Sequence, residues 1–381
     1  MPRMADRYPT SVPYRQATDG YHTYRIPAAV VTAAGTILAF AEGRRGSASD
    51  SGHIDLVLKR SGDGGRTWGP LQVVATEPNR GTAGNPAPAV LGDGRVVLVH
   101  VRQGPTATEE KIRRGQVAAD AGRRVFVQVR TDEGVTWPAP REITAEVKRP
   151  GWRWYATTPG HALVLRHGPH AGRLVVPANH SLPPTGKDDG TEGKYNGGHV
   201  LLSDDGGTTW RIGYVDDNPD GYVNVNETTA AELPGGRLYL NTRTDSTAPG
   251  TRADAYSADG GQTLELPFRP QTGLIGPVVE GSLLWCDGPE ALLFSGPAAP
   301  DTRALMTVRA SDDHGLTWRV AHTVSGLPAA YSDLVRVDGD TVGLLFETGN
   351  FGPYESIAFR RIPVAEMTGV RAPGGGSPSS P

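Results

Sequence analysis

Short apolar segments separated by tight polar turns run along this chain. The apolar triplet 89–91 is followed by Gly92-Asp93-Gly94 and then by the apolar run 96–101, and the same cadence recurs at residues 231–240 and 334–346. Asp-Gly between two short apolar runs favours a β-hairpin, because both central residues of a type I′ turn need a positive φ. Long apolar stripes with helical spacing are missing from the sequence. The pattern therefore predicts many short antiparallel strands.

A longer phrase, Ser-x-Asp-x-Gly-x-Thr-Trp, repeats between these hairpins. Three copies are complete and two are degenerate, and they begin at residues 61, 130, 203, 257 and 311. The aspartate can accept hydrogen bonds from backbone N–H groups two residues on, and the glycine can adopt the left-handed conformation. We therefore interpret each box as a structural turn and not as a set of catalytic residues. Repetition at these intervals indicates one supersecondary unit copied around an axis. With a further unit closed by the two chain ends, it predicts an all-β protein, a six-bladed β-propeller of four-stranded antiparallel blades.

Composition and charge narrow the possible partners. The formal net charge is −3, which gives no reason to expect nucleic acid or an anionic membrane as a partner. No apolar run approaches the length needed to span a membrane, so no membrane insertion is expected. We expect a single propeller at residues 21–370, an N-terminal extension at 1–20 and a disordered Gly/Ser/Pro-rich tail at 371–381.

Cysteine use and the N-terminal residues bear on the compartment. Cys286 is the only cysteine, so an internal disulfide is impossible and a reducing compartment fits. Residues 1–13 lack the apolar stretch of a signal peptide. These features favour a cytoplasmic protein, with secretion as the alternative if a leader had been removed.

Several arginines stand at the ends of predicted strands from different repeats. Arg25 precedes an apolar strand in Tyr24-Arg25-Ile26-Pro27, Arg243 ends the strand at 238–241, and Arg309 ends the strand at 305–308. Guanidinium groups that converge bind a planar carboxylate through paired, charge-assisted hydrogen bonds. His-Glu-x-x-His, P-loop and EF-hand patterns are all missing from the sequence, so no metal and no cofactor are predicted, although a structural calcium stays open.

The boxes, the Tyr-Arg-Ile-Pro segment and the stretch Ala39-Phe-Ala-Glu-Gly-Arg44 together resemble the exo-sialidase (neuraminidase) family of bacterial type. The resemblance covers roughly residues 21–362. It implies a retaining exo-α-sialidase, a glycoside hydrolase that removes terminal sialic acids through a tyrosyl-linked intermediate. The implied substrates are sialylated oligosaccharides, glycoproteins or gangliosides, and we expect a monomer.

The resemblance also assigns a carboxylate-binding triad. It matches Arg25, Arg243 and Arg309 to the three arginines that bind the carboxylate of the sugar. A glutamate braces the first arginine in this family, and Glu355 matches it, with Glu347 in reserve.

Three further positions match the catalytic groups of the family. Asp50, in the loop 46–53, matches the acid/base aspartate, with Asp55 as the weaker candidate; Tyr331 matches the nucleophile and Glu227 its partner. A tyrosine suits this substrate because a carboxylate nucleophile would approach the carboxylate on the anomeric carbon. At about 4 Å and an effective dielectric near 20, that repulsion is about 4 kcal/mol.

Weaker sequence similarities to the family add further residues to the expected pocket. Arg44 is expected to face the sugar ring with Glu42 in support, and Asn85, His161 and Tyr155 are possible pocket residues. Trp154 and Tyr195 could line the glycerol or aglycone side.

Two other functions remain open from the sequence. A sialic-acid-binding, lectin-like propeller would keep the arginines but would not need Asp50, Tyr331 and Glu227. A sialidase-fold enzyme of different outcome would act as a trans-sialidase, as an intramolecular transferase or on a deaminated sialic acid. Cleavage of a sialoside separates the first from an enzyme, and the product identifies the second.

Overall fold

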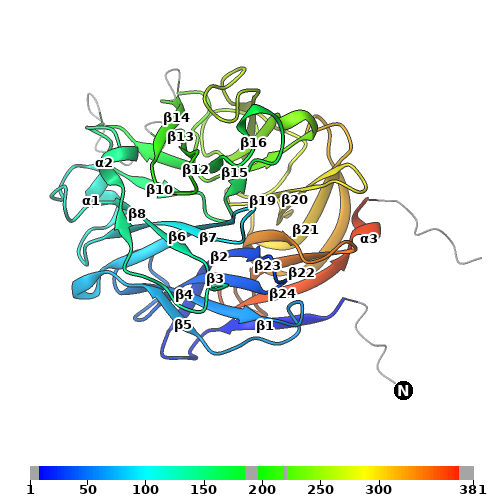
Figure 1. Ribbon diagram of the computed structural model, residues 1–381, viewed down its shortest axis with the longest axis horizontal. Helices are drawn as coiled ribbons and strands as arrows, with labels where there is room; N and C mark the ends of the chain where they lie inside the picture. The colour runs from blue at the N-terminus through cyan, green and yellow to red at the C-terminus, as the bar shows by residue number, and fades with distance from the viewer. Residues whose placement is uncertain (1–7, 185–195, 218–220, 369–381) are drawn as a thin grey trace, which may run out of the picture.

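The computed structural model describes residues 8–184, 196–217 and 221–368. Tyr195 and the tail at 371–381 lie outside the described residues, so the predictions made for them stay predictions. The regular secondary structure of the described chain is almost entirely β-strand, and the strands surround a common centre (Figure 1). It has three short helices, α1 (Glu109–Arg113), α2 (Thr144–Val147) and α3 (Val364–Thr368), and 3-10 turns η1 (Pro78–Arg80), η2 (Gly168–His170) and η4 (Pro234–Gly236).

The strands hydrogen-bond into sheets of eight, seven, five and four strands. The eight-stranded sheet has the order β2 (Thr23–Val31), β3 (Ile37–Arg44), β4 (Ile54–Ser61), β6 (Thr82–Val90), β7 (Val96–Gln103), β8 (Arg124–Arg130) and β9 (Arg141–Glu142), with β5 (Gln72–Ala75) beside β4. The seven-stranded sheet has the order β1 (Thr10–Arg15), β24 (Ser356–Pro363), β23 (Thr341–Thr348), β22 (Arg319–Arg336), β21 (Ala304–Ser311), β20 (Ala291–Pro297) and β19 (Ser282–Cys286).

The two smaller sheets complete the fold. The five-stranded sheet has the order β10 (Tyr155–Thr157), β12 (Leu174–Ser181), β13 (Asn196–Ser203) and β14 (Arg211–Asp216), with β11 (Leu163–Val164) beside β12. The four-stranded sheet has the order β15 (Thr228–Glu232), β16 (Leu238–Arg243), β17 (Arg252–Ser257) and β18 (Arg269–Pro270).

The all-β prediction is confirmed, but the prediction of a six-bladed propeller of four-stranded antiparallel blades is wrong. None of the sheets formed by the described residues closes on itself, and only one has four strands. A parallel bridge between Ile54 and Thr82 joins β4 to β6, so that two repeats share one sheet. The 18-residue strand β22 pairs with β21 along its first part and with β23 along its last part, which merges two more. The spacing of the boxes counts repeats, but it cannot report hydrogen bonds between repeats.

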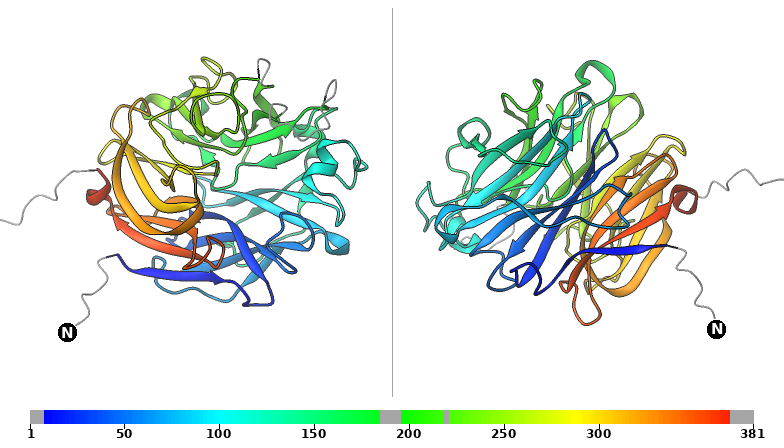
Figure 2. Two further views of the ribbon diagram at one scale, coloured as in Figure 1. Left: turned by 180° about the vertical axis from the view of Figure 1, so that it is seen from behind. Right: turned by 60° about the horizontal axis from the view of Figure 1, so that its bottom comes forward.

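Apolar packing links each sheet to the next. One buried cluster contains Val99 of the eight-stranded sheet and Val176 of the five-stranded sheet. Further clusters join the five- to the four-stranded sheet, the four- to the seven-stranded sheet, and the seven- back to the eight-stranded sheet. The sheets therefore surround one central region, which the views from behind and from below also show (Figure 2). Strand β1 pairs with β24 and brings the N-terminal residues beside the last strand.

The boxes are hydrogen-bonded turns. In the first box, Asp63 Oδ1 accepts N–H groups from Arg66 and Thr67 at 3.0 Å each, and Asp63 Oδ2 accepts the Thr67 hydroxyl at 2.6 Å. The Ser61 hydroxyl accepts the N–H of Gly65 at 2.8 Å. The same bonds recur around Asp205, Asp259 and Asp313, in agreement with a turn device. In the described part of the chain, no helix combines the length and apolarity that crossing a membrane requires.

Gly65 allows a test of how closely the first box packs against Phe359 of β24. Its φ is +83°, and a methyl group there would collide with the ring of Phe359. Gly35 has nearly the same φ, +85°, with open space around it. Left-handed backbone costs a residue with a Cβ about 1–2 kcal/mol, and overpacking adds about 1–3 kcal/mol. In urea denaturation, Gly65→Ala should lower the free energy of unfolding by about 2–5 kcal/mol and Gly35→Ala by only about 1–2 kcal/mol. Equal losses would contradict the packing described.

Candidate active site

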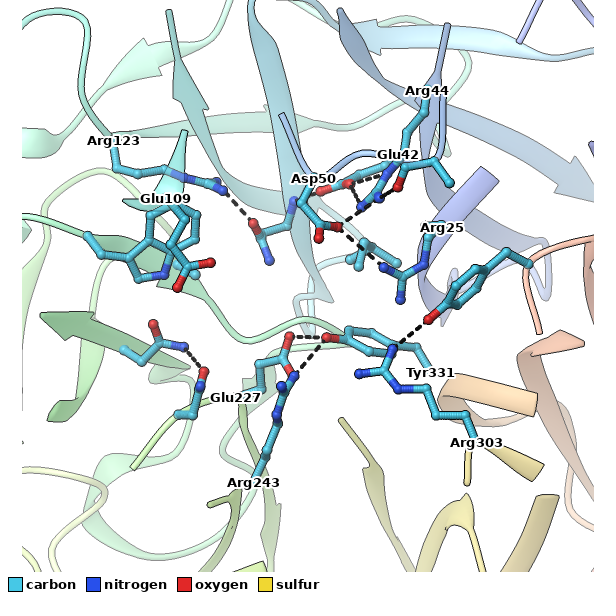
Figure 3. Close-up of a pocket in the computed structure, with 18 residues that line it drawn as sticks. Arg25, Glu42, Arg44, Asp50, Glu109, Arg123, Glu227, Arg243, Arg303 and Tyr331 are labelled. Carbon is cyan, nitrogen blue, oxygen red and sulfur yellow. Dashed lines mark hydrogen bonds and ion pairs between the residues drawn. The ribbon is translucent and has the colours of Figure 1, made fainter. Parts of the chain in front are cut away.

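A polar pocket of about 320 Å³ opens where the sheets meet (Figure 3). Its walls come from every sheet: Arg25 from β2, Asn179 from β12, Arg243 from β16 and Tyr331 from β22 all line it. Residues more than 300 positions apart in the chain therefore share one cavity. This convergence is what the sequence predicted for Arg25, Arg243 and Tyr331.

Tyr331 and Glu227 form the shortest contact in the pocket. The Tyr331 hydroxyl donates to Glu227 Oε1 at 2.5 Å, and Arg243 Nη1 donates to Glu227 Oε2 at 2.8 Å and to the tyrosine oxygen at 3.2 Å. Burial, and after it the charge of Glu227, raise the pKa of Tyr331 well above its ordinary value, while Arg243 and Arg25 oppose the rise. The phenol is therefore neutral, with a carboxylate ready to accept its proton.

Arg25 is braced by Glu347. The guanidinium binds this fully buried carboxylate through two bonds, Nε to Oε1 at 3.1 Å and Nη2 to Oε2 at 3.2 Å. Burial alone would lower the pKa of Arg25, but Glu347, together with Tyr331, Tyr354 and Asp50, outweighs burial and raises the pKa, so Arg25 is a cation. The ring of Tyr354 lies 4.2 Å from the same guanidinium.

The assignment of Glu355 as the brace is corrected. Glu355 instead accepts the backbone N–H groups of Asn350, Phe351 and Gly352 at 2.8–3.1 Å and shapes the turn between β23 and β24. Glu347, the reserve candidate, is the next-to-last residue of β23 and accepts the backbone N–H of Tyr331 on the paired strand, so it faces the pocket side. A match by local sequence could not separate two glutamates eight residues apart in one hairpin.

Arg303, and not Arg309, lines the pocket together with Arg25 and Arg243, so the assignment of Arg309 is corrected. Arg303 lines the cavity, and its Nη1 donates to the Tyr354 hydroxyl at 2.7 Å. Arg309 donates to the carbonyl of Ile275 and borders a different, much smaller cavity. Arg303 directly precedes β21 and Arg309 lies within it, six positions further on, which is about 20 Å in an extended strand.

The direction of the strands that lead to the boxes, relative to the pocket, explains this error. Asp50, Arg123 and Arg303 all line the pocket, and each lies one to four residues before a strand, β4, β8 or β21, that ends at a box. The box therefore marks the end of the strand far from the pocket. Arg309 lies only two residues before the box that begins at Ser311, so it belongs to the outer end. Counting a strand length back from each box would have found Arg303 and Arg123.

Asp50 lies at the pocket mouth with its side chain 74% exposed. Its Oδ1 is 2.7 Å from Arg44 Nη1 and 3.3 Å from Arg25 Nη1. Partial desolvation opposes ionisation, but Arg44 and Arg25 outweigh it and lower the pKa of Asp50. Asp55, the weaker candidate, is buried outside the pocket, where it accepts from the Tyr21 hydroxyl and from Arg45.

Arg44 is held by Glu42 beneath the pocket floor. Glu42 Oε2 accepts from Arg44 Nη2 at 2.7 Å, and Glu42 Oε1 accepts the N–H of Asn85 at 3.0 Å. All three residues line the pocket, as the sequence predicted. A side chain at Gly84 would displace the Glu42 carboxylate, so glycine is required for this close approach.

The wall opposite the three arginines is also polar (Figure 3). Arg123 Nη1 donates to Asn85 Oδ1 at 3.0 Å, and its guanidinium lies 4.0 Å from the ring centre of Trp154. Burial lowers the pKa of Arg123 to about 10. Glu109, on α1, faces it from the half-exposed side of the pocket. Arg123 and Glu109 were missed from the sequence, and Glu109 carries no motif that would have found it.

Tyr155 and His161 do not line this pocket, which corrects two of the softer predictions. Tyr155 is buried against Trp152, and its hydroxyl donates to the carbonyl of Val147 at 3.3 Å. Successive side chains of a strand point to opposite faces, so Trp154 and Ala156 reach the pocket while Tyr155 faces the core.

His161 is bonded to Asp333, which is fully buried. Its Nδ1 lies 2.7 Å from Asp333 Oδ1, and its backbone N–H donates to Asp333 Oδ2 at 3.0 Å. It borders a separate cavity of about 80 Å³. Among the residues that the structure describes, no cluster of three His, Cys, Asp or Glu side chains is placed to hold a metal ion.

Comparison with known proteins identifies the family. Residues 35–344 match the BNR repeat-like domain. A sialidase of Micromonospora viridifaciens is 34% identical over 375 residues, 93% of this chain and 54% of that protein. An exo-alpha-sialidase of Aspergillus fumigatus is 30% identical over 377 residues, 90% of this chain and 84% of that protein. The chain therefore belongs to the sialidase family, and the predicted resemblance is confirmed.

Solved structures share the fold. A Hadza microbial sialidase superposes with a TM-score of 0.78 at 24% identity, covering 94% of this chain and 69% of that one. An intramolecular trans-sialidase from Ruminococcus gnavus gives a TM-score of 0.76 at 18% identity, covering 94% and 98%. The chain spans about half the length of the Micromonospora relative and most of the Aspergillus one.

The His161–Asp333 pair predicts a pH-dependent contribution to stability. Burial alone would lower the pKa of His161, but Asp333 outweighs it and raises the pKa. The stabilisation is therefore complete below about pH 6.5, the pKa of an exposed histidine, and is lost as the pH rises through the raised value. The difference in unfolding free energy between the wild type and His161→Gln should be larger at pH 6 than at pH 9. A difference that stays constant or grows with pH would contradict the ion pair.

Proposed function

We propose that this chain is a retaining exo-α-sialidase that hydrolyses terminal sialic acids of oligosaccharides, glycoproteins or gangliosides through a covalent bond to Tyr331. The observation that carries the proposal is the Tyr331–Glu227 hydrogen bond of 2.5 Å inside a pocket whose lining includes the guanidinium groups of Arg25, Arg243 and Arg303. The relatives named as sialidases support the same activity.

The three arginines would bind the carboxylate of the sugar. Each is held from behind by a different group: Arg25 by Glu347, Arg243 by Glu227 and Arg303 by the Tyr354 hydroxyl. Planar guanidinium groups bind a carboxylate through paired hydrogen bonds, which fixes both its position and its orientation. The anomeric carbon, which carries this carboxylate, is then placed beside Tyr331.

The first chemical step would form a glycosyl–tyrosine bond. The Tyr331 oxygen attacks the anomeric carbon while its proton passes to Glu227 over the existing hydrogen bond. The bond to the leaving oxygen breaks, and Asp50 protonates that oxygen. In the second step water attacks the same carbon, Asp50 accepts its proton, and Glu227 returns the proton to Tyr331. Two displacements at one carbon give net retention.

The ion pairs of Asp50 explain how it could act as an acid. Without substrate, Arg44 and Arg25 keep the pKa of Asp50 low. A substrate carboxylate bound to Arg25 would offset that positive charge and add a negative charge nearby. Both effects raise the pKa of Asp50. Binding of the correct substrate would thus prepare the proton donor.

Substitution of the nucleophile tests the proposal. The wild type should release sialic acid from sialyllactose, with the α-anomer as the first product in NMR spectra. Tyr331→Phe should lose at least about 100-fold in kcat, because no oxygen remains to attack. Tyr155→Phe, a change in the neighbouring core, should keep kcat near the wild-type value. Near-normal kcat for Tyr331→Phe would reject the nucleophile, binding without cleavage would favour a lectin, and transferred or anhydro products would favour a transferase.

Paired lysine substitutions test the corrected triad. A lysine cannot replace the two-pronged guanidinium contact, so Arg303→Lys should raise KM for sialyllactose at least about tenfold, equivalent to about 1.4 kcal/mol. Arg309→Lys alters a residue of β21 that lies outside the pocket and should leave KM unchanged. Initial-rate kinetics measure both, and the reverse order of effects would restore Arg309 to the triad.

A further inference from the structure

The backbone at Tyr331 departs from a regular strand. In the pairing of β22 with β23, Ala329 lies opposite Thr348, but Ser332 lies opposite Phe346, so one extra residue is inserted at Ala330–Tyr331. A β-bulge of this kind re-aims a side chain and leaves backbone groups without ladder partners. Here it directs Tyr331 into the pocket.

Two carboxylates take up the N–H groups of the bulge. Glu347 Oε2 accepts the N–H of Tyr331 at 3.2 Å, and Glu280 Oε2 accepts the N–H of Ser332 at 3.0 Å. Glu280 comes from the segment before β19, so the bulge is held from both neighbouring elements. The position of the Tyr331 oxygen depends on both contacts.

The two carboxylates differ in how their charge is balanced. Glu347 binds the guanidinium of Arg25 through both oxygens. Glu280 is 3% exposed, and its Oε1 is buried with no hydrogen-bond partner in the described part of the chain. The nearby cation, Arg252, donates instead to Asn241 and to the carbonyl of Val279.

Two acidic groups also face Glu280, while the guanidinium of Arg309, which borders the same small cavity, donates to the carbonyl of Ile275. Glu227 approaches from the loop before β15, and Asp333 from β22. A Cβ at Gly160 would lie 3.8 Å from Glu280 Oε1 and 3.3 Å from Asp333 Oδ1, so the two carboxylates border the same space. His161 is already bonded to Asp333. A negative charge on Glu280 would therefore be buried beside two anions, which is unfavourable.

We propose that Glu280 is a positioning residue for Tyr331, and that it holds the bulge as an uncharged carboxylic acid. Its carbonyl oxygen, Oε2, accepts the Ser332 N–H, and the proton resides on Oε1. Burial, reinforced by Glu227 and Asp333, raises the pKa of Glu280 well above its ordinary value, although the Ser332 N–H and Arg252 oppose the rise. With Glu280 uncharged, Glu227 is the carboxylate that accepts the proton of Tyr331. The inference rests on the proposed sialidase activity.

Two substitutions of Glu280 test the proposal through kcat, KM and the pH profile. Glu280→Gln reproduces the uncharged acid, so kcat and KM on sialyllactose at neutral pH should stay within about twofold of the wild type. Because an amide cannot ionise, the alkaline limb of kcat should move to higher pH. Glu280→Ala removes the acceptor of the Ser332 N–H, and kcat should fall at least about tenfold with KM nearly unchanged, since the arginines are untouched.

Glu232 supplies the matched control. It is 6% exposed and accepts the backbone N–H groups of Arg166 and His167 at 2.7 and 2.9 Å, outside the pocket. Glu232→Ala should lower the thermal unfolding temperature without changing kcat or the pH profile. It thereby separates a general loss of stability from misplacement of Tyr331.

Each outcome decides a part of the proposal. Wild-type kcat in Glu280→Ala overturns the positioning role. An unchanged alkaline limb in Glu280→Gln, or a loss of kcat as large as in the alanine variant, overturns the uncharged state. If Glu280→Ala does not fold, Glu280→Gln with its pH profile still decides. If the wild type does not cleave sialyllactose, the proposed function is refuted. If the wild type cleaves sialyllactose and Glu280→Ala has the same kcat, only the positioning role is refuted.

Discussion

One buried carboxylate, that of Glu347, ties together the two parts of the site that must not move relative to each other. It binds the guanidinium of Arg25 and also accepts the N–H groups of Ile26 and Tyr331. The carboxylate-binding cation and the nucleophile thus share one anchor, although 306 positions separate them (331 − 25). A buried charge is tolerated only when it is paired and hydrogen-bonded. Without Arg25, Glu347 would be an uncompensated anion in the interior.

Irregular backbone recurs where strands meet the pocket. The register of β2 shifts between Arg25 and Ala28, that of β6 between Gly84 and Ala87, and that of β22 between Ala329 and Ser332. Ile26 and Asn85 have φ values of 60° and 52°, which are uncommon for residues with a Cβ. The apolar packing between the sheets holds these bulges in place. At these three positions the irregular backbone presents side chains to the pocket.

Charge balance organises the pocket. Glu227 is paired with Arg243, Glu347 with Arg25 and Glu42 with Arg44, so most of the anions have a guanidinium within hydrogen-bonding distance. Each arginine is thereby fixed in place while part of its guanidinium still faces the cavity (Figure 3). Glu280 departs from this rule, which is why its protonation state matters for Tyr331.

Local sequence was enough to predict the class of strands, the family and those site residues that lie inside short, distinctive phrases. Four residues from such phrases reach the pocket: Arg25 in Tyr-Arg-Ile-Pro, Asp50, Glu227 and Tyr331. A short phrase can be matched without knowing which segment lies across the sheet. Arg123 was missed from the sequence, Arg309 was assigned in place of Arg303, and Glu347 was only the reserve candidate, because the folded chain first shows which end of each strand faces the centre. The merging of repeats into larger sheets likewise depends on contacts such as Ile54 with Thr82, between residues 28 positions apart (82 − 54). Periodicity encodes the strands and the turns between them, whereas hydrogen bonds and ion pairs between distant segments form only when packing brings those segments together.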